Sequence, residues 1–289
     1  MLSVTNLTKS FHAFTLQDIN FELPKGYLMG LIGPNAAGKS TLIKTILNIY
    51  RPDKGNVTIN GYNLQVQEAQ AKDCVGTVLD ENFFEYNLTA KANANLYGRF
   101  FSNYSYSIFQ NYCNQFDLDP KQKLSKYSKG MQMKFQLAFA LSHQAKLLLL
   151  DEPTASLDPT FRKELLSILA DLISDGEHSV LLSTHLTEDL DQLADYITFI
   201  NKGRQVLSMN VEDLLSSYQV ITCEPYKLAL LPKDLIIWKE TTSFGSKALI
   251  KKKRISCLPE GIKFQRPTVE DIMYYMVKGE VKHVETHSA

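Results

Sequence analysis

The stretch Gly33-Pro34-Asn35-Ala36-Ala37-Gly38-Lys39-Ser40 decides the fold of this 289-residue chain. It matches the pattern Gly-x-x-x-x-Gly-Lys-Ser/Thr at every fixed position. The apolar residues 27–32 before it predict a strand, and residues 39–49 after it predict a helix. A glycine-bearing turn can match such a pattern by accident, but the strand–loop–helix context favours a nucleotide site.

The chemistry of this loop follows from its backbone. Its N–H groups and those of the helix N-terminus converge on phosphate oxygens, and the helix dipole favours their negative charge. Lys39 is expected to neutralise the β- and γ-phosphates of ATP, and the Ser40 hydroxyl to ligate Mg²⁺. The sequence therefore assigns nucleotide contacts to Gly33, Pro34, Asn35, Ala36, Ala37, Gly38, Lys39, Ser40 and Thr41.

A second predicted strand ends in two adjacent acids. Residues 147–150 are four leucines, typical of a buried strand, and Asp151 and Glu152 follow directly. Two carboxylates are costly to desolvate without a cation, and a bound Mg²⁺ removes that cost. Asp151 is therefore predicted to hold the metal through water, and Glu152 to polarise the attacking water.

Strands and helices alternate along most of residues 1–215, which predicts a parallel α/β sheet covered on both faces. Residues 81–143 interrupt the alternation with an aromatic-rich segment, which we interpret as a helical insertion with its own small core. Residues 216–289 show short alternating strands and a last helix, typical of a small α+β appendage. Thr268 and Asp271 predict a capping box where that last helix begins.

Composition limits the partners. Lys+Arg and Asp+Glu both number 31, so the formal net charge is zero and no nucleic-acid partner is expected. No apolar run approaches the ~18–20 residues that a membrane-spanning helix needs. The cysteines are widely spaced, which favours a reducing compartment: Cys74, Cys113, Cys223 and Cys257. A connection to a membrane is therefore expected only through a partner.

Three further motifs point to one family. Tyr127-Ser128-Lys129-Gly130-Met131-Gln132 precedes Asp151 at the spacing of a Leu-Ser-Gly-Gly-Gln signature. Ala155-Ser156-Leu157-Asp158 matches a D-loop, and Ser183-Thr184-His185 a switch histidine. Over residues 1–215 the chain resembles the ATP-binding subunits of ABC transporters. The resemblance implies an α/β P-loop NTPase core with an antiparallel β subdomain, the helical insertion at about 81–143, and residues 216–289 as an accessory or dimerisation region.

The resemblance also implies how two subunits share ATP. Ser128 and Gly130 would contact, in trans, the γ-phosphate of ATP bound to the opposite subunit. Asp158 would couple the two sites across the dimer interface. Ser128 also has a simpler interpretation as a helix cap.

Within one subunit, the resemblance implies a catalytic set of Glu152, His185 and Lys39, in which His185 senses the γ-phosphate. Phe11 would stack on the adenine ring. Simpler interpretations stand beside these: His185 as a structural histidine at a strand end, and Phe11 as an edge-strand aromatic.

Three motifs depart from the family pattern. The fourth loop residue, usually Gly, is Ala36; because a positive φ would cost Ala roughly 1–2 kcal/mol, a negative φ is expected. The signature carries Lys129 and Met131, which resembles ABC-2-type exporters of bacitracin and other membrane-active peptides, including phenol-soluble modulins. Asp80 replaces the glutamine of the Q-loop and is expected to meet Mg²⁺ or its water and to relay the state of the site.

The expected activity is ATP hydrolysis that powers transport through a separate membrane-spanning subunit, at the cytoplasmic face of a bacterial cell membrane. That subunit is expected to dock near the segment from Asp80 to Thr89 and the helical insertion. The chain would pair with itself or with a homologous ATP-binding subunit. Three alternatives stay open: a soluble ABC ATPase acting on the ribosome or another assembly, a subunit that binds ATP but hardly hydrolyses it, and an importer subunit.

Overall fold

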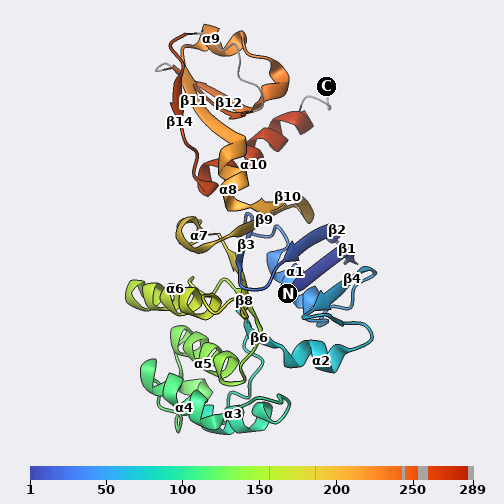
Figure 1. Ribbon diagram of the computed structural model, residues 1–289, viewed down its shortest axis with the longest axis vertical. Helices are drawn as coiled ribbons and strands as arrows, with labels where there is room; N and C mark the ends of the chain where they lie inside the picture. Colours follow the sequence, from blue (N-terminus) through green and yellow to red (C-terminus); the bar gives the residue numbers. More distant parts are fainter. Residues whose placement is uncertain (156, 186, 243–244, 253–259, 286–289) are drawn as a thin grey trace. The chain divides into compact units, whose positions relative to one another are not determined.

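The structure is a computed structural model that describes residues 1–155, 157–185, 187–242, 245–252 and 260–285 (Figure 1). The chain divides into two compact units, Met1–His185 with Tyr196–Ser208, and Leu186–Asp195 with Met209–Ala289. Ser156 of the predicted D-loop and Cys257 lie outside the described residues. No described helix is long and apolar enough to cross a membrane.

One sheet organises the first unit. Its described strands follow the order β5-β4-β1-β2-β10-β9-β3-β8-β7-β6. Their bounds are β1 Leu2–Ser10, β2 Thr15–Leu23, β3 Leu28–Ile32, β4 Lys54–Ile59, β5 Tyr62–Asn63, β6 Val75–Val78, β7 Leu147–Asp151, β8 Ser179–Thr184, β9 Tyr196–Asn201 and β10 Arg204–Asn210.

The sheet combines a parallel and an antiparallel part. Strand β3 pairs in parallel with β8 and β9, and β7 pairs in parallel with β6 and β8. Strand β1 pairs antiparallel with β2 and β4, and β4 with β5. Both the parallel α/β sheet and the antiparallel β subdomain that the resemblance implies are confirmed. Because β3, β7 and β8 run in the same direction, the loops that follow them meet at one edge of the sheet.

The helices of the first unit are α1 Lys39–Ile46, α2 Glu68–Asp73, α3 Ala90–Gly98, α4 Tyr106–Gln115, α5 Lys129–Ser142 and α6 Pro159–Ile173, with a 3₁₀ turn at Leu124–Lys126. Helix α1 ends three residues before the predicted residue 49. Asn48 has φ 56°, and the N–H of Ile49 donates to the carbonyl of Lys44 at 2.9 Å. A left-handed residue with this hydrogen bond is a Schellman-type helix end, so the chain leaves the helix there.

The predicted helical insertion consists of α3, α4 and α5, drawn in green to yellow-green in Figure 1. Its aromatic core is confirmed in part: Phe109 and Phe135 are fully buried with ring centroids 5.9 Å apart, and Phe84 lies 4.8 Å from Phe135. Phe100 differs, because its side chain is 77% exposed. The aromatic core therefore forms along one face of these helices, and other aromatic side chains lie at the surface.

The second unit is an α+β arrangement around a four-stranded antiparallel sheet in the order β12-β13-β11-β14. The predicted capping box is confirmed, because Thr268 Oγ1 accepts from the N–H of Asp271 at 3.0 Å and Asp271 Oδ2 accepts from the N–H of Thr268 at 3.2 Å. The elements of this unit are α7 Glu188–Leu193, α8 Val211–Ser217, β11 Tyr218–Cys223, α9 Pro225–Ala229, a 3₁₀ turn at Lys233–Leu235, β12 Ile236–Thr242, β13 Gly245–Lys251, β14 Lys263–Gln265 and α10 Val269–Glu285.

Candidate nucleotide-binding site

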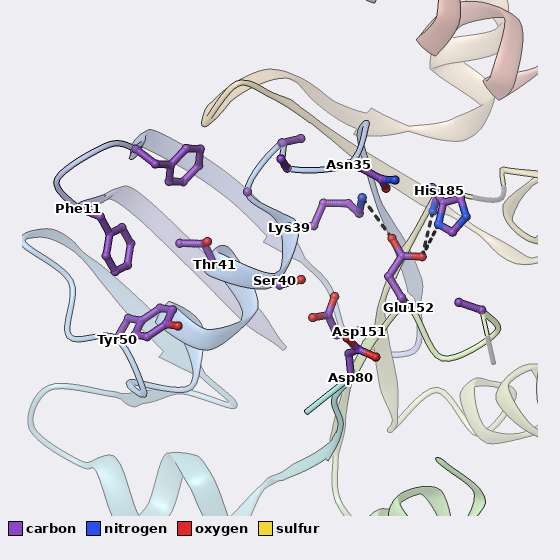
Figure 2. Close-up of a pocket in the computed structure, with 15 residues that line it drawn as sticks. Phe11, Asn35, Lys39, Ser40, Thr41, Tyr50, Asp80, Asp151, Glu152 and His185 are labelled. Carbon is purple, nitrogen blue, oxygen red and sulfur yellow. Dashed lines mark hydrogen bonds and ion pairs between the residues drawn. The ribbon is translucent and has the colours of Figure 1, made fainter. Parts of the chain in front are cut away.

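A cavity of about 790 Å³ lies where the loops after β3, β7 and β8 meet (Figure 2). Tyr50, Phe14 and Ala155 also line it, although the sequence predicts no nucleotide contact for them. Gly33, Pro34, Ser128, Gly130 and Asp158 are not among its lining residues. The predicted site residues that line it are Phe11, Asn35, Ala36, Ala37, Gly38, Lys39, Ser40, Thr41, Asp80, Asp151, Glu152 and His185.

Two glycines allow the loop before α1 to pack tightly. A Cβ on Gly33 would lie 2.2 Å from the carbonyl oxygen of Ile200, so no side chain fits there. Gly38 has φ 111°, and a Cβ on it would lie 2.8 Å from the ring of Phe14. Gly38 is also the N-cap of α1, with no side-chain cap and no acid in the first turn. No side chain of the first turn of α1 therefore competes with an anion for the N–H groups at this helix N-terminus.

Ala36 corrects an expectation, because its φ is 61° and not negative. The N–H of Ala37 donates to the carbonyl of Pro34 at 3.1 Å, which closes a turn with Ala36 at its third position. A positive φ at this position is the mark of a type II turn, which normally places Gly there. The closed turn therefore holds Ala36 in a conformation that costs it about 1–2 kcal/mol.

Lys39 lies at the centre of a set of oxygen atoms. Its side chain is only 6% exposed, and its Nζ donates to the carbonyl of Gly33 at 2.8 Å. The carbonyl of Pro34 lies 3.5 Å from the same Nζ, and Glu152 Oε1 lies 3.2 Å from it. These contacts hold the ammonium group of Lys39 beside the phosphate loop. A bound phosphate would replace the Glu152 carboxylate as the anion that pairs with Lys39.

The two acids after β7 are held differently. Asp151 is buried and accepts from Ser183 Oγ at 2.5 Å. Glu152 has φ 49°, and its N–H donates to Ser183 Oγ at 3.0 Å and to the carbonyl of Ser183 at 3.1 Å. Ser183 on β8 therefore orients both acids, in a backbone conformation that is strained for a residue other than Gly.

His185 completes this side of the cavity. Its Nδ1 pairs with Glu152 Oε2 at 2.7 Å, and its backbone N–H donates to the same oxygen at 3.3 Å. Figure 2 shows Glu152 between Lys39 and His185. The ring itself is 44% exposed, so it is open to a ligand in the cavity.

The opposite end of the cavity is aromatic. Phe11 is 40% exposed, and its ring meets that of Tyr50 edge to face with centroids 5.2 Å apart. Figure 2 shows this pair on the far side of Thr41 from Glu152. Apolar aromatic faces suit a purine base, whereas the charged end suits phosphates. No sequence pattern marks Tyr50, because it enters the site only through the turn that ends α1.

Comparisons with known proteins agree with this geometry. A family model described as ABC transporter matches residues 16–155. The chain is 30% identical over 217 residues to the bacitracin transport ATP-binding protein BcrA of Enterococcus faecalis, a match that covers 74% of this chain and 70% of the relative. The chain belongs to the ABC transporter family.

Other matches of this ABC subunit extend the comparison. It is 32% identical over 212 residues to the Nod factor export ATP-binding protein I of Sinorhizobium fredii strain NGR234, a match that covers 71% of this chain. That match spans only 62% of the relative's length. A solved structure of an ATP-binding subunit of an ABC transporter aligns with a TM-score of 0.68 at 26% identity and covers 74% of this chain and 91% of that chain.

The family assignment confirms the predicted fold and activity. The subunit is an ATP-binding and ATP-hydrolysing subunit of a transporter, and the predicted P-loop fold and resemblance to ABC-2-type exporters are confirmed. A bacterial ABC transporter cassette solved as a dimer shares this fold, with a TM-score of 0.65 at 22% identity over 73% of this chain and 98% of that chain. The alternative of a soluble ATPase acting on the ribosome finds no support among these relatives.

The signature and D-loop residues of the ABC subunit cap helices in this structure. Ser128 is the N-cap of α5, and its Oγ accepts from the N–H of Met131 at 3.2 Å. Asp158 is the N-cap of α6, where its Oδ1 accepts from the N–H groups of Thr160 and Phe161, both at 3.0 Å. These donors lower the pKa of Asp158 below its usual value. Both side chains are exposed, so capping leaves them open to a partner.

The oxygen ligands of the ABC subunit fit Mg²⁺. Ser40, Asp151 and Asp80 line the same cavity and lie beside one another in Figure 2. Among the described residues, no group of three or more His, Cys, Asp or Glu side chains could hold a metal ion by itself. A cation that takes its remaining ligands from phosphate and water suits such a site, and Mg²⁺ binds in this way.

Proposed function

We propose that this subunit powers the export of membrane-active amphiphilic molecules, such as antimicrobial peptides, through a separate membrane subunit at the cytoplasmic face of a bacterial membrane. The relatives support this direction and substrate class, because one is a Nod factor export protein and another a bacitracin transport protein. The observation that carries the motor role is the placement of Glu152 between Lys39 and His185, since a subunit that only binds ATP has no need of a positioned base.

The proposed hydrolytic roles follow from this arrangement. The loop from Gly33 to Gly38 and the ammonium group of Lys39 bind the phosphates. Glu152 accepts a proton from the attacking water, and His185 contacts the γ-phosphate. Mg²⁺, held by Ser40 and by Asp151 and Asp80 directly or through water, would neutralise charge that develops on the β- and γ-phosphates.

We further propose that two ATP-binding subunits close head to tail around ATP, as a homodimer or with a homologous subunit. Ser128, Gly130 and Asp158 do not line their own subunit's cavity, which supports a contact in trans. The ATP-binding domain is assigned to residues 1–215 and an accessory or dimerisation role to residues 216–289. Converting a mostly open dimer into a mostly closed one needs about 5.5 kcal/mol of differential binding. Charge-assisted hydrogen bonds at two sites are strong enough to supply it.

The proposed docking segment for the membrane subunit runs from Asp80 to Thr89. It exposes three large apolar side chains: Phe83 (54% exposed), Tyr86 (45%) and Leu88 (38%). Exposed apolar side chains that gather in one short segment are typical of a protein interface. The segment also begins at the cavity with Asp80, so a partner seated there would respond to the nucleotide.

The test is to tag the subunit in its native host, solubilise the membranes gently and identify what copurifies. A multi-spanning membrane protein at comparable stoichiometry supports the proposal; ribosomal or other soluble assemblies would overturn it. Phe83→Glu should abolish the copurification and leave the basal ATPase rate unchanged. Val66→Glu, at an apolar position that is 82% exposed outside the segment, is the matched control and should retain the partner.

A further inference from the structure

A buried amide side chain holds the backbone directly before Asp80. Gln136 on α5 is 5% exposed. Its Oε1 accepts from the N–H of Leu79 at 2.9 Å, and its Nε2 donates to the carbonyl of Leu79 at 3.0 Å. Strand β6 ends at Val78, so this side chain provides the two hydrogen bonds that a neighbouring strand would otherwise make. Helix α5 is thereby fixed to the residue that precedes Asp80.

The same helix carries the signature at its N-terminus. Ser128 caps the N-terminus of α5, about two turns before Gln136. A continuous helix over this length moves as one body, since its backbone hydrogen bonds are all internal. Helix α5 therefore sets both the position of Asp80 in one ATP site and the position of Ser128 toward the partner's site.

A second buried amide holds the far end of the docking segment. Asn93 on α3 is fully buried, and its Oδ1 accepts from the N–H of Glu85 at 2.9 Å. Its Nδ2 donates to the carbonyls of Glu85 at 3.0 Å and of Thr89 at 3.1 Å. Both ends of the segment are thus held by side chains of the helical insertion.

The segment is tied to the phosphate loop's helix by a weaker contact. Lys44 on α1 pairs with Glu81 at 2.8 Å, but the Glu81 side chain is 64% exposed. Solvent and salt screen such an exposed pair, whereas the buried hydrogen bonds of Gln136 and Asn93 are not screened. The segment should consequently follow the helical insertion when that insertion and α1 move apart.

We propose that Gln136 is a positioning residue that locks Asp80 to the signature helix, so that ATP contacts at Asp80 and at Ser128 form together and the docking segment moves with them. This inference rests on the proposed roles of Asp80 and Ser128. Gln136 touches neither nucleotide nor metal and acts only through the backbone of Leu79. Loss of its amide should therefore impair the hydrolytic step more than nucleotide binding on the loop.

The first test is Gln136→Leu, which keeps a similar side-chain volume and removes both hydrogen bonds. Its kcat for Mg-ATP should fall about fivefold or more, while KM and the Kd for ATP change less than about twofold. The matched control is Ser142→Ala, which removes a fully buried hydrogen bond from the same helix, to the carbonyl of Phe139, without touching Leu79. Equal kcat for folded wild type and Gln136→Leu would overturn the inference.

A double-mutant cycle separates positioning from general structural damage. If Gln136 acts through Asp80, Gln136→Leu should lower kcat little further in an Asp80→Ala background. If Gln136→Leu lowers kcat by the same factor in the wild-type and Asp80→Ala backgrounds, the inference is overturned while the role of Asp80 stands. A wild-type rate in Asp80→Ala alone would instead refute the role proposed for Asp80, and with it the inference.

A measurement on the wild type keeps the test independent of how well the variant folds. On addition of Mg²⁺ and a non-hydrolysable ATP analogue, the amide of Leu79 and the amides of α5 should gain protection from hydrogen exchange together. Protection of α5 without any change at Leu79 would contradict the proposed coupling of Leu79 to α5 through Gln136.

Discussion

The Nζ of Lys39 lies 3.2 Å from one oxygen of Glu152, and the other oxygen of the same carboxylate pairs with His185 Nδ1 at 2.7 Å. One side chain thus joins the lysine that we propose to bind phosphate to the histidine that we propose to contact it. A γ-phosphate is an anion that competes with Glu152 for both partners. ATP entry should therefore exchange one anion for another at Lys39 and release Glu152 to face the attacking water.

Glu152→Gln should slow ATP hydrolysis about 100-fold or more, because an amide cannot act as the general base. Its affinity for ATP should be equal or higher, since Gln no longer competes with phosphate as an anion at Lys39. Single-turnover hydrolysis and equilibrium nucleotide binding measure the two effects. Glu177→Gln, at an exposed acid that pairs with Lys25 at 2.8 Å, is the control. A wild-type hydrolysis rate in Glu152→Gln would refute the assigned role.

Lys39→Ala should weaken ATP binding about 10- to 100-fold, because charge-assisted hydrogen bonds to phosphate are lost. Titration with a fluorescent ATP analogue gives the Kd. The matched control is Lys25→Ala, which removes a lysine ion pair with Glu177 and should leave the Kd unchanged. Unchanged affinity in Lys39→Ala would mean that the lysine does not bind the nucleotide.

Ala36→Gly should raise the free energy of unfolding by about 0.5–1 kcal/mol. Glycine relieves the strain of φ 61° at this position, although it also gains entropy in the unfolded chain. Equilibrium urea unfolding measures the change. Ala37→Gly is the control, because the buried Ala37 does not share the positive φ and its replacement should destabilise the fold. Equal destabilisation by both variants would show that Ala36 is not strained.

Phe11→Ala and Tyr50→Ala should each weaken ATP binding about three- to tenfold, because each removes an aromatic wall from the uncharged end of the cavity. The ring centroids of Phe11 and Tyr50 lie 5.2 Å apart, so the double variant should lose less ATP affinity than the product of the two single effects. Tyr27→Ala breaks a similar edge-to-face pair with Tyr196, at 5.5 Å and outside the cavity, and serves as the control. Tight ATP binding by the double variant would exclude base stacking at this end.

His143 should make the fold acid-sensitive. Its ring is 2% exposed, and its Nδ1 and Nε2 each lie 3.1 Å from a carbonyl oxygen, of Phe139 and Val75. Burial outweighs these acceptors and lowers the pKa of His143 below its usual value. The unfolded chain therefore binds the proton more readily, and stability is lost as the pH falls from about 6.5 through the folded-state pKa.

The check is urea unfolding of the wild type and His143→Gln at pH 8 and at pH 5.5. The variant should lose less stability than the wild type between these two values, since other titrating groups are common to both proteins. Parallel loss of stability in the two proteins would show that His143 does not titrate in this window.

The sequence predicted the core of the site because its chemistry is local in the chain. Residues 33–40 carry their own strand and helix on either side, and Asp151 and Glu152 end a run of leucines, so pattern alone located them. Tyr50 escaped prediction because it joins Phe11 only across a turn, and the sequence does not record which aromatic side chains meet in space. Gln136 and Asn93 likewise become significant only through their backbone partners, Leu79 at a separation of 57 residues and Glu85 at a separation of 8.

The sequence by itself determined the family, the phosphate loop, the acidic strand end and the α/β sheet, because each depends on residue types at fixed spacings along one element. Only the tertiary structure decided the sign of φ at Ala36, the bridge from Lys39 through Glu152 to His185, and the lock of Gln136 on Leu79. These features arise where a closed turn, parallel strand ends or a packed helix bring separate segments within hydrogen-bond distance. Periodicity along a chain carries no information about such contacts between segments.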